Sequence, residues 1–201
     1  MIVLNHEQRS PEWFEDRLGK LTGSRAKRVF ATNNLPLVDE LIAELLTGVQ
    51  EETYTTAEMQ RGIDLEPEAC DRYEEHTGYP VEHTGLCVHP TFDFLAISPD
   101  GWTNDRTGAV EIKCPSSKVH IRYLRQAGIP AEYRYQVLHY FLVNEQLEWL
   151  DFVSYDPRVK GYSFFLERVT REELTSDIEE ARVAIFKFYD KFQKYYNKIK
   201  G

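Results

Sequence analysis

Cysteine is scarce in this sequence, and the cysteines present form no recognisable framework. The 201 residues include three, Cys70, Cys87 and Cys114, and no two of them form a CxxC pair. This pattern argues against disulfides and a cysteine zinc site, and predicts reduced thiols in a cytoplasmic protein. The six histidines lack HxH and HExxH spacing, so they are expected to be surface or half-buried residues and not zinc ligands.

Long apolar runs and flexible linkers are also missing. No run of 18 apolar residues occurs, and the N-terminus lacks the apolar segment of a signal peptide, so no membrane association is expected. There is no internal repeat, low-complexity segment or Gly/Ser linker. With 42% hydrophobic and 13% aromatic residues, the sequence predicts an ordinary globular protein with a single domain over residues 1–201.

Positive charge is in deficit. The chain has 24 Lys and Arg against 33 Asp and Glu, for a net charge of −9. Proteins that bind DNA by simple phosphate neutralisation tend to be basic, so the composition argues mildly against a nucleic-acid partner. A metal-dependent nuclease can nevertheless be acidic, because bound cations neutralise its carboxylates. Net charge therefore does not decide the question.

Hydrophobic periodicity and end signals predict helices, then strands, then a helix, two strands and a final helix. Helices are expected over residues 10–18, 22–30, 37–46, 58–77, 130–143 (amphipathic) and 170–198. Strands are expected over 80–88, 92–98, 108–114, 147–155 and 161–169. Pro67 should kink or divide the fourth helix. The order indicates an α/β domain with a central mixed β-sheet flanked by helices.

Two carboxylates and one ammonium group fall on an expected β-hairpin. Asp100 follows the apolar segment 94–98, and Glu111 and Lys113 lie on the alternating segment 108–114. Residues two apart on a strand share a face, and Asp100 can sit across from Glu111. Oxygen ligands of this kind suit Mg²⁺, and an adjacent lysine can orient a water. The pattern is degenerate, however, and fits a solvated Glu/Lys surface pair equally well.

Six blocks in a fixed order resemble one known family. They are WFEDRLGKLTGS (13–24), RGIDLE (61–66), SPDG (98–101), EIKCP (111–115), YQV (135–137) and YDPR (155–158). Together they resemble the lambda-exonuclease/YqaJ-type viral recombinase family of the PD-(D/E)xK nuclease superfamily. The resemblance spans almost the whole chain and implies a restriction-endonuclease-like core.

The resemblance implies a role for each residue of the hairpin. Asp100 and Glu111 would be metal ligands, joined by the backbone carbonyl of Ile112, and Lys113 would be the catalytic lysine. Glu66 would be a further carboxylate approaching the metal, although the residues alone favour a helix-surface charge.

A second helix residue would complete this site. The resemblance implies that Gln136 positions water or phosphate. From the sequence alone, an exposed helix glutamine is the favoured interpretation.

A 5′-phosphate site is implied by three further matches, Arg17, Ser24 and Ser98. Arginine offers a charged fork to phosphate oxygens, and serine hydroxyls add donors. The alternatives are that Arg17 pairs with Glu12 or Asp16, and that Ser24 is only a helix N-cap; Ser24 can serve both purposes.

Outside these sites, three features have a functional and a plainer interpretation. Met59 takes the family position of a wedge between separating strands, or is a buried helix methionine. A basic stretch consists of Lys118, Arg122, Arg125 and Arg134. It either lines the DNA path or is the solvated face of a helix. The final helix, with aromatic and lysine residues over 186–196, stacks on bases or packs on the sheet.

The family resemblance implies a Mg²⁺-dependent 5′→3′ exonuclease of linear double-stranded DNA, with two metal ions per site and Mn²⁺ as a possible substitute. It would release mononucleotides and leave a 3′ overhang for phage-type recombination by strand annealing. A homotrimeric ring, a single-strand-annealing partner, and a phage or prophage gene expressed in the bacterial cytoplasm are implied as well. The alternatives are an endonuclease on the same core and a non-catalytic DNA-end-binding protein.

Overall fold

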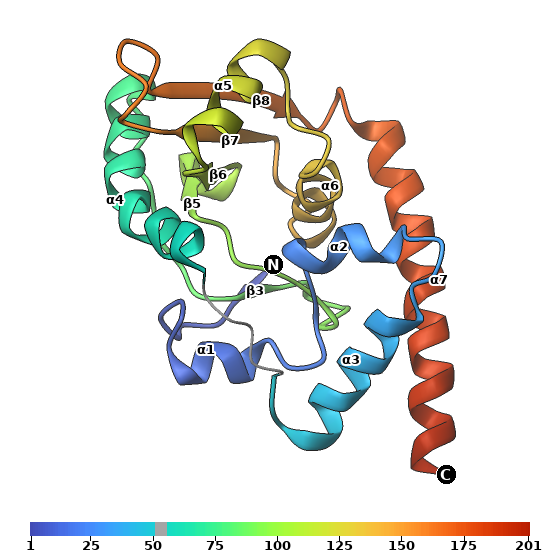
Figure 1. Ribbon diagram of the computed structural model, residues 1–201. Helices are drawn as coiled ribbons and strands as arrows, with labels where there is room; N and C mark the ends of the chain where they lie inside the picture. Colours follow the sequence, from blue (N-terminus) through green and yellow to red (C-terminus); the bar gives the residue numbers. More distant parts are fainter. Residues whose placement is uncertain (51–55) are drawn as a thin grey trace.

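The computed structural model describes residues 1–50 and 56–201. Its strands and helices alternate as expected for an α/β fold (Figure 1). The elements in chain order are β1 (Ile2–Val3), α1 (Pro11–Asp16), β2 (Leu21–Thr22), α2 (Gly23–Val29), α3 (Leu35–Thr47), α4 (Ala57–Thr77), β3 (Cys87–Val88), β4 (Leu95–Ile97), β5 (Gly101–Thr103), the 3₁₀ turn η1 (Asn104–Arg106), β6 (Gly108–Lys113), α5 (Ser117–Gln126), α6 (Arg134–Val143), β7 (Trp149–Tyr155), β8 (Phe164–Thr170) and α7 (Thr175–Lys200).

The strands form two mixed sheets of four, where the sequence predicted one. Their orders are β1-β3-β4-β2 and β5-β6-β7-β8. The chain passes from the first sheet to the second between β4 and β5, through residues 98–100. Asp100 therefore lies at the junction of the two sheets, and β6 and β7 pair in parallel at the centre of the second sheet.

The hairpin that carries the carboxylates differs from the expected one. The antiparallel partner of β6 is β5, with Gly101 opposite Val110, whereas the segment 94–98 pairs with β2 and β3. Trp102 is fully buried and belongs to β5, although the sequence predicts no strand between residues 98 and 108. The turn comes later, where Asn104, Asp105 and Arg106 all adopt positive φ. Asp100, one residue before β5, is nevertheless in line with Glu111.

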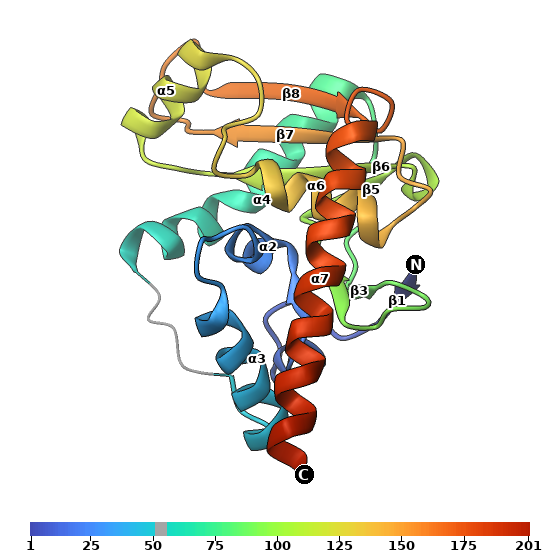
Figure 2. The same cartoon turned by 90° about the vertical axis from the view of Figure 1, so that its right-hand side faces the viewer.

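Helices cover both faces of the second sheet. In Figure 1, α4 lies on one side of β6 and β7 while α6 and α7 lie on the other, and Figure 2 shows the same arrangement from the side. The structure does not divide α4 at Pro67, so that alternative is wrong. The helix expected over 130–143 begins only at Arg134, and its last seven residues are all buried. It is enclosed by α2, α7 and β4 and is not amphipathic.

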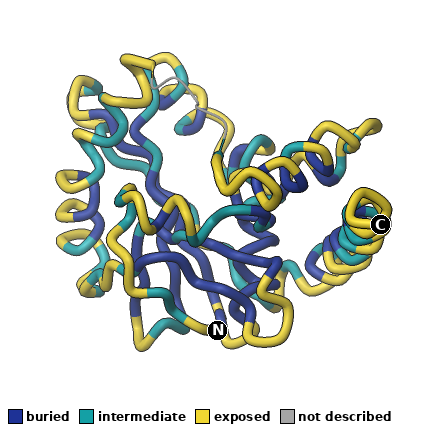
Figure 3. Tube along the Cα trace, turned by 90° about the horizontal axis from the view of Figure 1, so that it is seen from below, coloured by how far each residue is buried: buried dark blue, intermediate teal, exposed yellow. Residues whose placement is uncertain are grey.

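The C-terminal helix packs against the body of the protein. Its buried residues recur at helical spacing: Ile178, Ala181, Ile185, Phe188 and Phe192. Figure 3 shows this inner side buried and the outer side exposed, which supports packing over base stacking. At Thr170, the expected start of this helix, the Glu173 carboxylate accepts from the Thr170 amide and the Thr170 hydroxyl accepts from the Glu173 amide. The helix itself begins at Thr175.

Buried histidines correct the expectation of surface or half-buried side chains. His89, His120 and His139 are all buried. His139 donates from Nε2 to the carbonyls of Leu21 and Ala96, at 2.9 and 3.1 Å, and so bridges β2 and β4. The rings of His89 and His120 are also hydrogen-bonded, whereas Nδ1 of His139 is buried without a partner in the described chain. Burial of this kind depends on tertiary packing, and the spacing of histidines along the sequence does not indicate it.

The three cysteines are free, as predicted, and all three are buried. Over residues 1–50 and 56–201, none of the helices has the length and apolar character needed to cross a membrane.

Candidate active site

The predicted carboxylates and lysine meet at the end of β6. Glu111 and Lys113 share a face, and the ammonium group of Lys113 contacts the Glu111 carboxylate. Asp100 Oδ2 accepts from the backbone N–H of Ile112 at 2.6 Å and lies 3.9 Å from Lys113 Nζ. The imidazole of His83 contacts the Asp100 carbonyl at 2.9 Å through Nδ1. The cluster is therefore a built site and not a solvated surface pair.

Glu111 is buried and accepts from three side chains. Besides Lys113, the Gln136 amide donates to Oε1 at 2.6 Å, and the Tyr140 hydroxyl donates to Oε2 at 2.5 Å. Gln136 is thus not an exposed helix glutamine. Sequence reasoning missed Tyr140, although its position four residues after Gln136 places it on the same helix face. Tyr133, whose ring centroid lies 5.6 Å from Lys113 Nζ, was also missed.

Glu111 is buried and Asp100 is half-buried, and these two carboxylates share a single cation. Burial, followed by the negative charge of Glu111, holds the pKa of Asp100 well above its usual range. Burial alone would lower the pKa of Lys113, but Glu111 and Asp100 outweigh it and raise that pKa, so the lysine stays charged. The net charge of this trio is negative when both acids ionise. A divalent cation with oxygen ligands fits this donor set, because Mg²⁺ often takes only one or two protein carboxylates.

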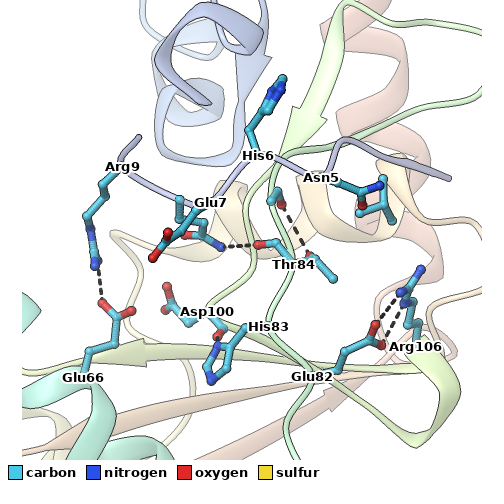
Figure 4. A pocket seen from close by; sticks show the side chains of 13 residues that line it. Asn5, His6, Glu7, Arg9, Glu66, Glu82, His83, Thr84, Asp100 and Arg106 are labelled. Carbon is cyan, nitrogen blue, oxygen red and sulfur yellow. Dashed lines mark hydrogen bonds and ion pairs between the residues drawn. The ribbon is translucent and has the colours of Figure 1, made fainter. Parts of the chain in front are cut away.

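Glu66 approaches the cluster from α4. It lines a cavity of about 440 Å³ together with Asp100 and Arg9 (Figure 4). The Arg9 guanidinium donates to Glu66 Oε2 at 2.7 Å. Within the described part of the chain, no three acidic, histidine or cysteine side chains already converge as metal ligands. Glu66 therefore faces the site but is held by an arginine.

Arg17 lies beside this cluster without an acidic partner. Its guanidinium donates to Ser98 Oγ at 3.2 Å and lies 4.1 Å from the ring centroid of Trp13. Burial, followed by the charge of Arg25, lowers the pKa of Arg17 to about 10. Its buried Nε has no hydrogen-bond partner, and Asp16 pairs with His6 instead. In residues 1–50 and 56–201 no salt bridge neutralises Arg17, so the expected alternative of a pair with Glu12 or Asp16 is absent.

Ser24 lies at the same edge of the first sheet as Ser98. β2 and β4 run parallel with Thr22 opposite Ala96, so both serines follow the same ends of neighbouring strands. Ser24 is exposed in the first turn of α2, whose N-cap residue is Thr22. The structure thus brings Arg17 and Ser98 into contact and places Ser24 beyond the same strand ends.

The wedge candidate and the basic stretch differ in how well the structure supports their functional interpretation. Met59 is 53% exposed in the first turn of α4, so it is not a buried methionine. Arg122 pairs with Glu132, and Arg134 pairs with Asp177, which reduces the positive charge available along the basic stretch.

Together, a carboxylate–lysine cluster at a sheet junction and an unpaired arginine next to it define a site suited to phosphodiester chemistry. The chain belongs to the YqaJ-like viral recombinase domain family, whose model matches residues 12–146. A comparison with curated proteins gives no match.

Solved structures extend this relationship over nearly the whole chain. An alkaline exonuclease (LHK-Exo) from Laribacter hongkongensis is 36% identical, over 95% of this chain and 96% of that one, with a TM-score of 0.87. LHK-Exo in complex with dAMP is 36% identical over 95% and 98%, with a TM-score of 0.81. A phage related exonuclease from Haemophilus somnus 129PT is 15% identical over 90% and 94%, with a TM-score of 0.61, and shares the fold. The restriction-endonuclease-like fold class is thereby confirmed.

Proposed function

We propose that the protein is a metal-dependent exonuclease that digests one strand of linear double-stranded DNA from its 5′ end. It releases mononucleotides and leaves a 3′ single-stranded overhang. Homology to an alkaline exonuclease supports nuclease activity. The observation that carries the 5′ polarity is the half-buried side chain of Arg17, which contacts Ser98, has a buried Nε without a hydrogen-bond partner, and lacks an acidic partner in the described chain.

A terminal phosphate supplies the missing anion. Arginine binds phosphate oxygens through a planar fork of donors, and the hydroxyls of Ser24 and Ser98 add neutral donors. Ser98 is two residues before Asp100, so a phosphate held here places the next linkage near the carboxylates. In this arrangement, cleavage takes place one nucleotide from the 5′ end.

Asp100, Glu111 and the backbone carbonyl of Ile112 would hold Mg²⁺, with Glu66 joining them after release from Arg9. Two ions per site are proposed, and Mn²⁺ would substitute. The bound metal lowers the pKa of the attacking water and stabilises the leaving oxygen.

The protein side chains position the reacting groups. Lys113 orients the attacking water and offsets negative charge that develops on the phosphate. Gln136 and Tyr140 orient Glu111 by donating one hydrogen bond to each of its oxygens, which leaves Oε2 a second lone pair for the metal. Met59, exposed at the start of α4, would separate the two strands.

Family membership supports a wider role. We place the enzyme in phage-type recombination, encoded by a phage or prophage and acting in the bacterial cytoplasm with a single-strand-annealing protein. A homotrimeric ring around DNA is the proposed assembly. Light scattering of the purified protein would give three times the 23.6 kDa chain mass if this assembly is right.

Three substrates test the activity. Purified protein with Mg²⁺ should degrade linear duplex with a 5′-phosphate, degrade 5′-hydroxyl duplex more slowly, leave closed circles intact, and stop when chelator is added. Cleavage of closed circles would identify an endonuclease. Binding of ends without cleavage would identify a non-catalytic end-binding protein.

Arg17→Ala tests the phosphate site separately. Digestion of 5′-phosphorylated ends should slow much more than digestion of 5′-hydroxyl ends. Arg28→Ala is a matched control, because Arg28 is an exposed arginine on α2 that pairs with Glu40. Equal losses on both substrates would remove the phosphate role from Arg17.

A further inference from the structure

Arg61 and Asp156 belong to two different sequence blocks and have no role in the proposed chemistry, and the structure joins them. Arg61 lies in the second turn of α4, and Asp156 directly follows β7. The Arg61 guanidinium donates from one terminal nitrogen to Asp156 Oδ1 at 2.8 Å. The Asp156 side chain is 0% exposed, so this ion pair is buried on its acidic side.

The other terminal nitrogen of Arg61 reaches the catalytic strand. It donates to the carbonyls of Pro115 and Cys114, at 2.8 and 3.2 Å. These are the two residues that follow Lys113. A planar guanidinium presents donors in fixed directions, so one side chain can hold both strand ends at once. Arg61 thus links α4 to the ends of β6 and β7.

Glu66 lies on the same helix, five residues after Arg61. At 1.5 Å of rise per residue the two are separated by about 7.5 Å along the helix axis. Figure 4 shows the Glu66 carboxylate on the side of α4 that faces Asp100. The contact that fixes Arg61 against β6 therefore also fixes the distance of Glu66 from the carboxylate cluster.

Asp156 has a second arginine partner that makes no such link. Arg158 donates to both Asp156 oxygens at 2.9 Å, and the hydroxyl of Ser117 donates at 2.6 Å. Although burial opposes it, these donors hold the pKa of Asp156 well below its usual range, so the acid is charged. In the described chain, Arg158 bonds only to Asp156 through its side chain. Arg61 and Arg158 share one acid, but only Arg61 touches the segment after Lys113.

We propose that Arg61 is a positioning residue for the catalytic site. Through Asp156 and the carbonyls of Cys114 and Pro115, it holds α4, and with it Glu66, in register with the strand that carries Glu111 and Lys113. This inference rests on the proposed nuclease function. It assigns Arg61 and Asp156 one shared task, which is to set the spacing between the additional carboxylate and the rest of the site.

The matched variants are Arg61→Ala and Arg158→Ala. Each is measured for kcat and KM on 5′-phosphorylated duplex, for Mn²⁺ affinity without DNA by calorimetry, and for Tm. Loss of a residue that orients metal ligands costs about 10- to 100-fold in affinity or activity. Arg61→Ala should show such a loss in kcat and in Mn²⁺ affinity, with KM changed little. Arg158→Ala should stay within about twofold of the wild type in both, whatever its effect on Tm.

The Arg61→Lys variant distinguishes the positioning role of the guanidinium from the effect of its positive charge. A lysine keeps the positive charge next to Asp156 but cannot direct donors to both strand ends, so it should not restore kcat. It also maintains the comparison if Arg61→Ala fails to fold. Equal losses in the Arg61 and Arg158 variants, or full rescue by lysine, would overturn the positioning role. A wild-type protein that binds Mn²⁺ but cuts no DNA would refute the proposed function, while the Mn²⁺ affinities would still decide the role of Arg61.

Discussion

The hydroxyl of Tyr140 lies 2.5 Å from Oε2 of Glu111 and donates a hydrogen bond to it in a fully buried setting. Burial and the neighbouring charge of Glu111 raise the pKa of Tyr140 well above its ordinary value, so the phenol keeps its proton. The side-chain amide of Gln136 donates a hydrogen bond to the other oxygen of the same carboxylate. Hydrogen bonds at both oxygens hold the Glu111 carboxylate in a single orientation toward a bound metal. The side chains of α6 that donate them are therefore part of the site.

Tyr140→Phe should therefore reduce catalysis more than stability. The ring still fills its place, but Glu111 loses one fixed donor and gains freedom to rotate. We expect kcat to fall by about 10-fold or more, the range found when a partner of a metal ligand is removed. Steady-state digestion of 5′-phosphorylated duplex measures this kcat. Tyr155→Phe is the control, because Tyr155 also donates to an acid, Glu68, but outside the cluster; equal effects would contradict the prediction.

Lys113→Ala should abolish cleavage without weakening metal binding. The substitution removes the cation that orients water and leaves both carboxylates in place. Removal of one preorganised group that stabilises developing negative charge costs about 100-fold or more in kcat. Gel-shift assays with Ca²⁺ should show intact DNA binding, and calorimetry should show Mn²⁺ affinity no lower than in the wild type. Turnover close to normal would falsify the role of Lys113.

Much of this site follows from spacing within single elements. Glu111 and Lys113 had to share a face because a strand alternates every two residues, and the structure confirms it. Gly48 follows the expected helix over 37–46, and it caps α3 with the positive φ that such an ending favours. Local chemistry is sufficient for features of this kind.

Features that depend on contacts distant in sequence were not predictable. The strand β5 has only three residues, which are too few to show the alternation of a strand. The sequence therefore does not predict it, and the burial of Trp102 is visible only in the structure. The pairing of Arg9 with Glu66 joins residues 57 apart, and nothing in either segment indicates it. The same holds for the two sheets, since the break between β4 and β5 depends on which strands each one meets.

Metal binding should stabilise the folded protein. A cation that neutralises Asp100 and Glu111 binds the native state only, and at 100 times Kd it contributes about 2.7 kcal/mol. For a chain of this length we expect a rise in Tm of about 5–10 °C with Mn²⁺ or Mg²⁺, reversed by chelator. Asp100→Asn should remove the rise. Asp93→Asn, at a highly exposed acid, should retain it; loss of the shift in both variants would indicate binding elsewhere.

Acid should destabilise the protein through His139. Burial lowers the pKa of His139 to about 4, with the hydrogen bonds to Leu21 and Ala96 opposing the shift. The unfolded histidine titrates near 6.5, so between these values the unfolded chain binds a proton that the folded chain does not. This contribution to stability is complete above about pH 6.5 and falls as pH decreases, by about 2 kcal/mol from pH 7.5 to pH 5.

His139→Gln checks the origin of this loss. Glutamine can donate to the same carbonyls but does not titrate, so urea unfolding should show a smaller decrease between the two pH values. The imidazole resonances of the wild type should titrate near pH 4 in NMR spectra. An unchanged pH dependence in the variant would assign the loss to other groups.

The ion pair between Arg25 and Glu44 should be the largest single polar contribution in the N-terminal half. Glu44 is 1% exposed and contacts both terminal nitrogens of Arg25, and its Oε2 accepts from the Gly19 amide at 3.0 Å. Glu44→Ala removes both close carboxylate contacts of a buried arginine and leaves it only the 3.5 Å contact with Glu40, which costs about 3 kcal/mol. For a chain of this length that corresponds to a Tm lower by about 10 °C.

Glu40→Ala is the matched control for this pair. Glu40 contacts the same arginine at 3.5 Å but is 25% exposed and also pairs with Arg28. An exposed pair contributes about 1 kcal/mol or less, so the loss should be several times smaller. Because Glu44 also anchors the amide of Gly19, two residues after Arg17, Glu44→Ala should in addition lessen the preference for 5′-phosphorylated ends. A variant with lower Tm but the same preference would show that the Arg17 segment is held by other contacts, such as the stacking of Arg17 on Trp13.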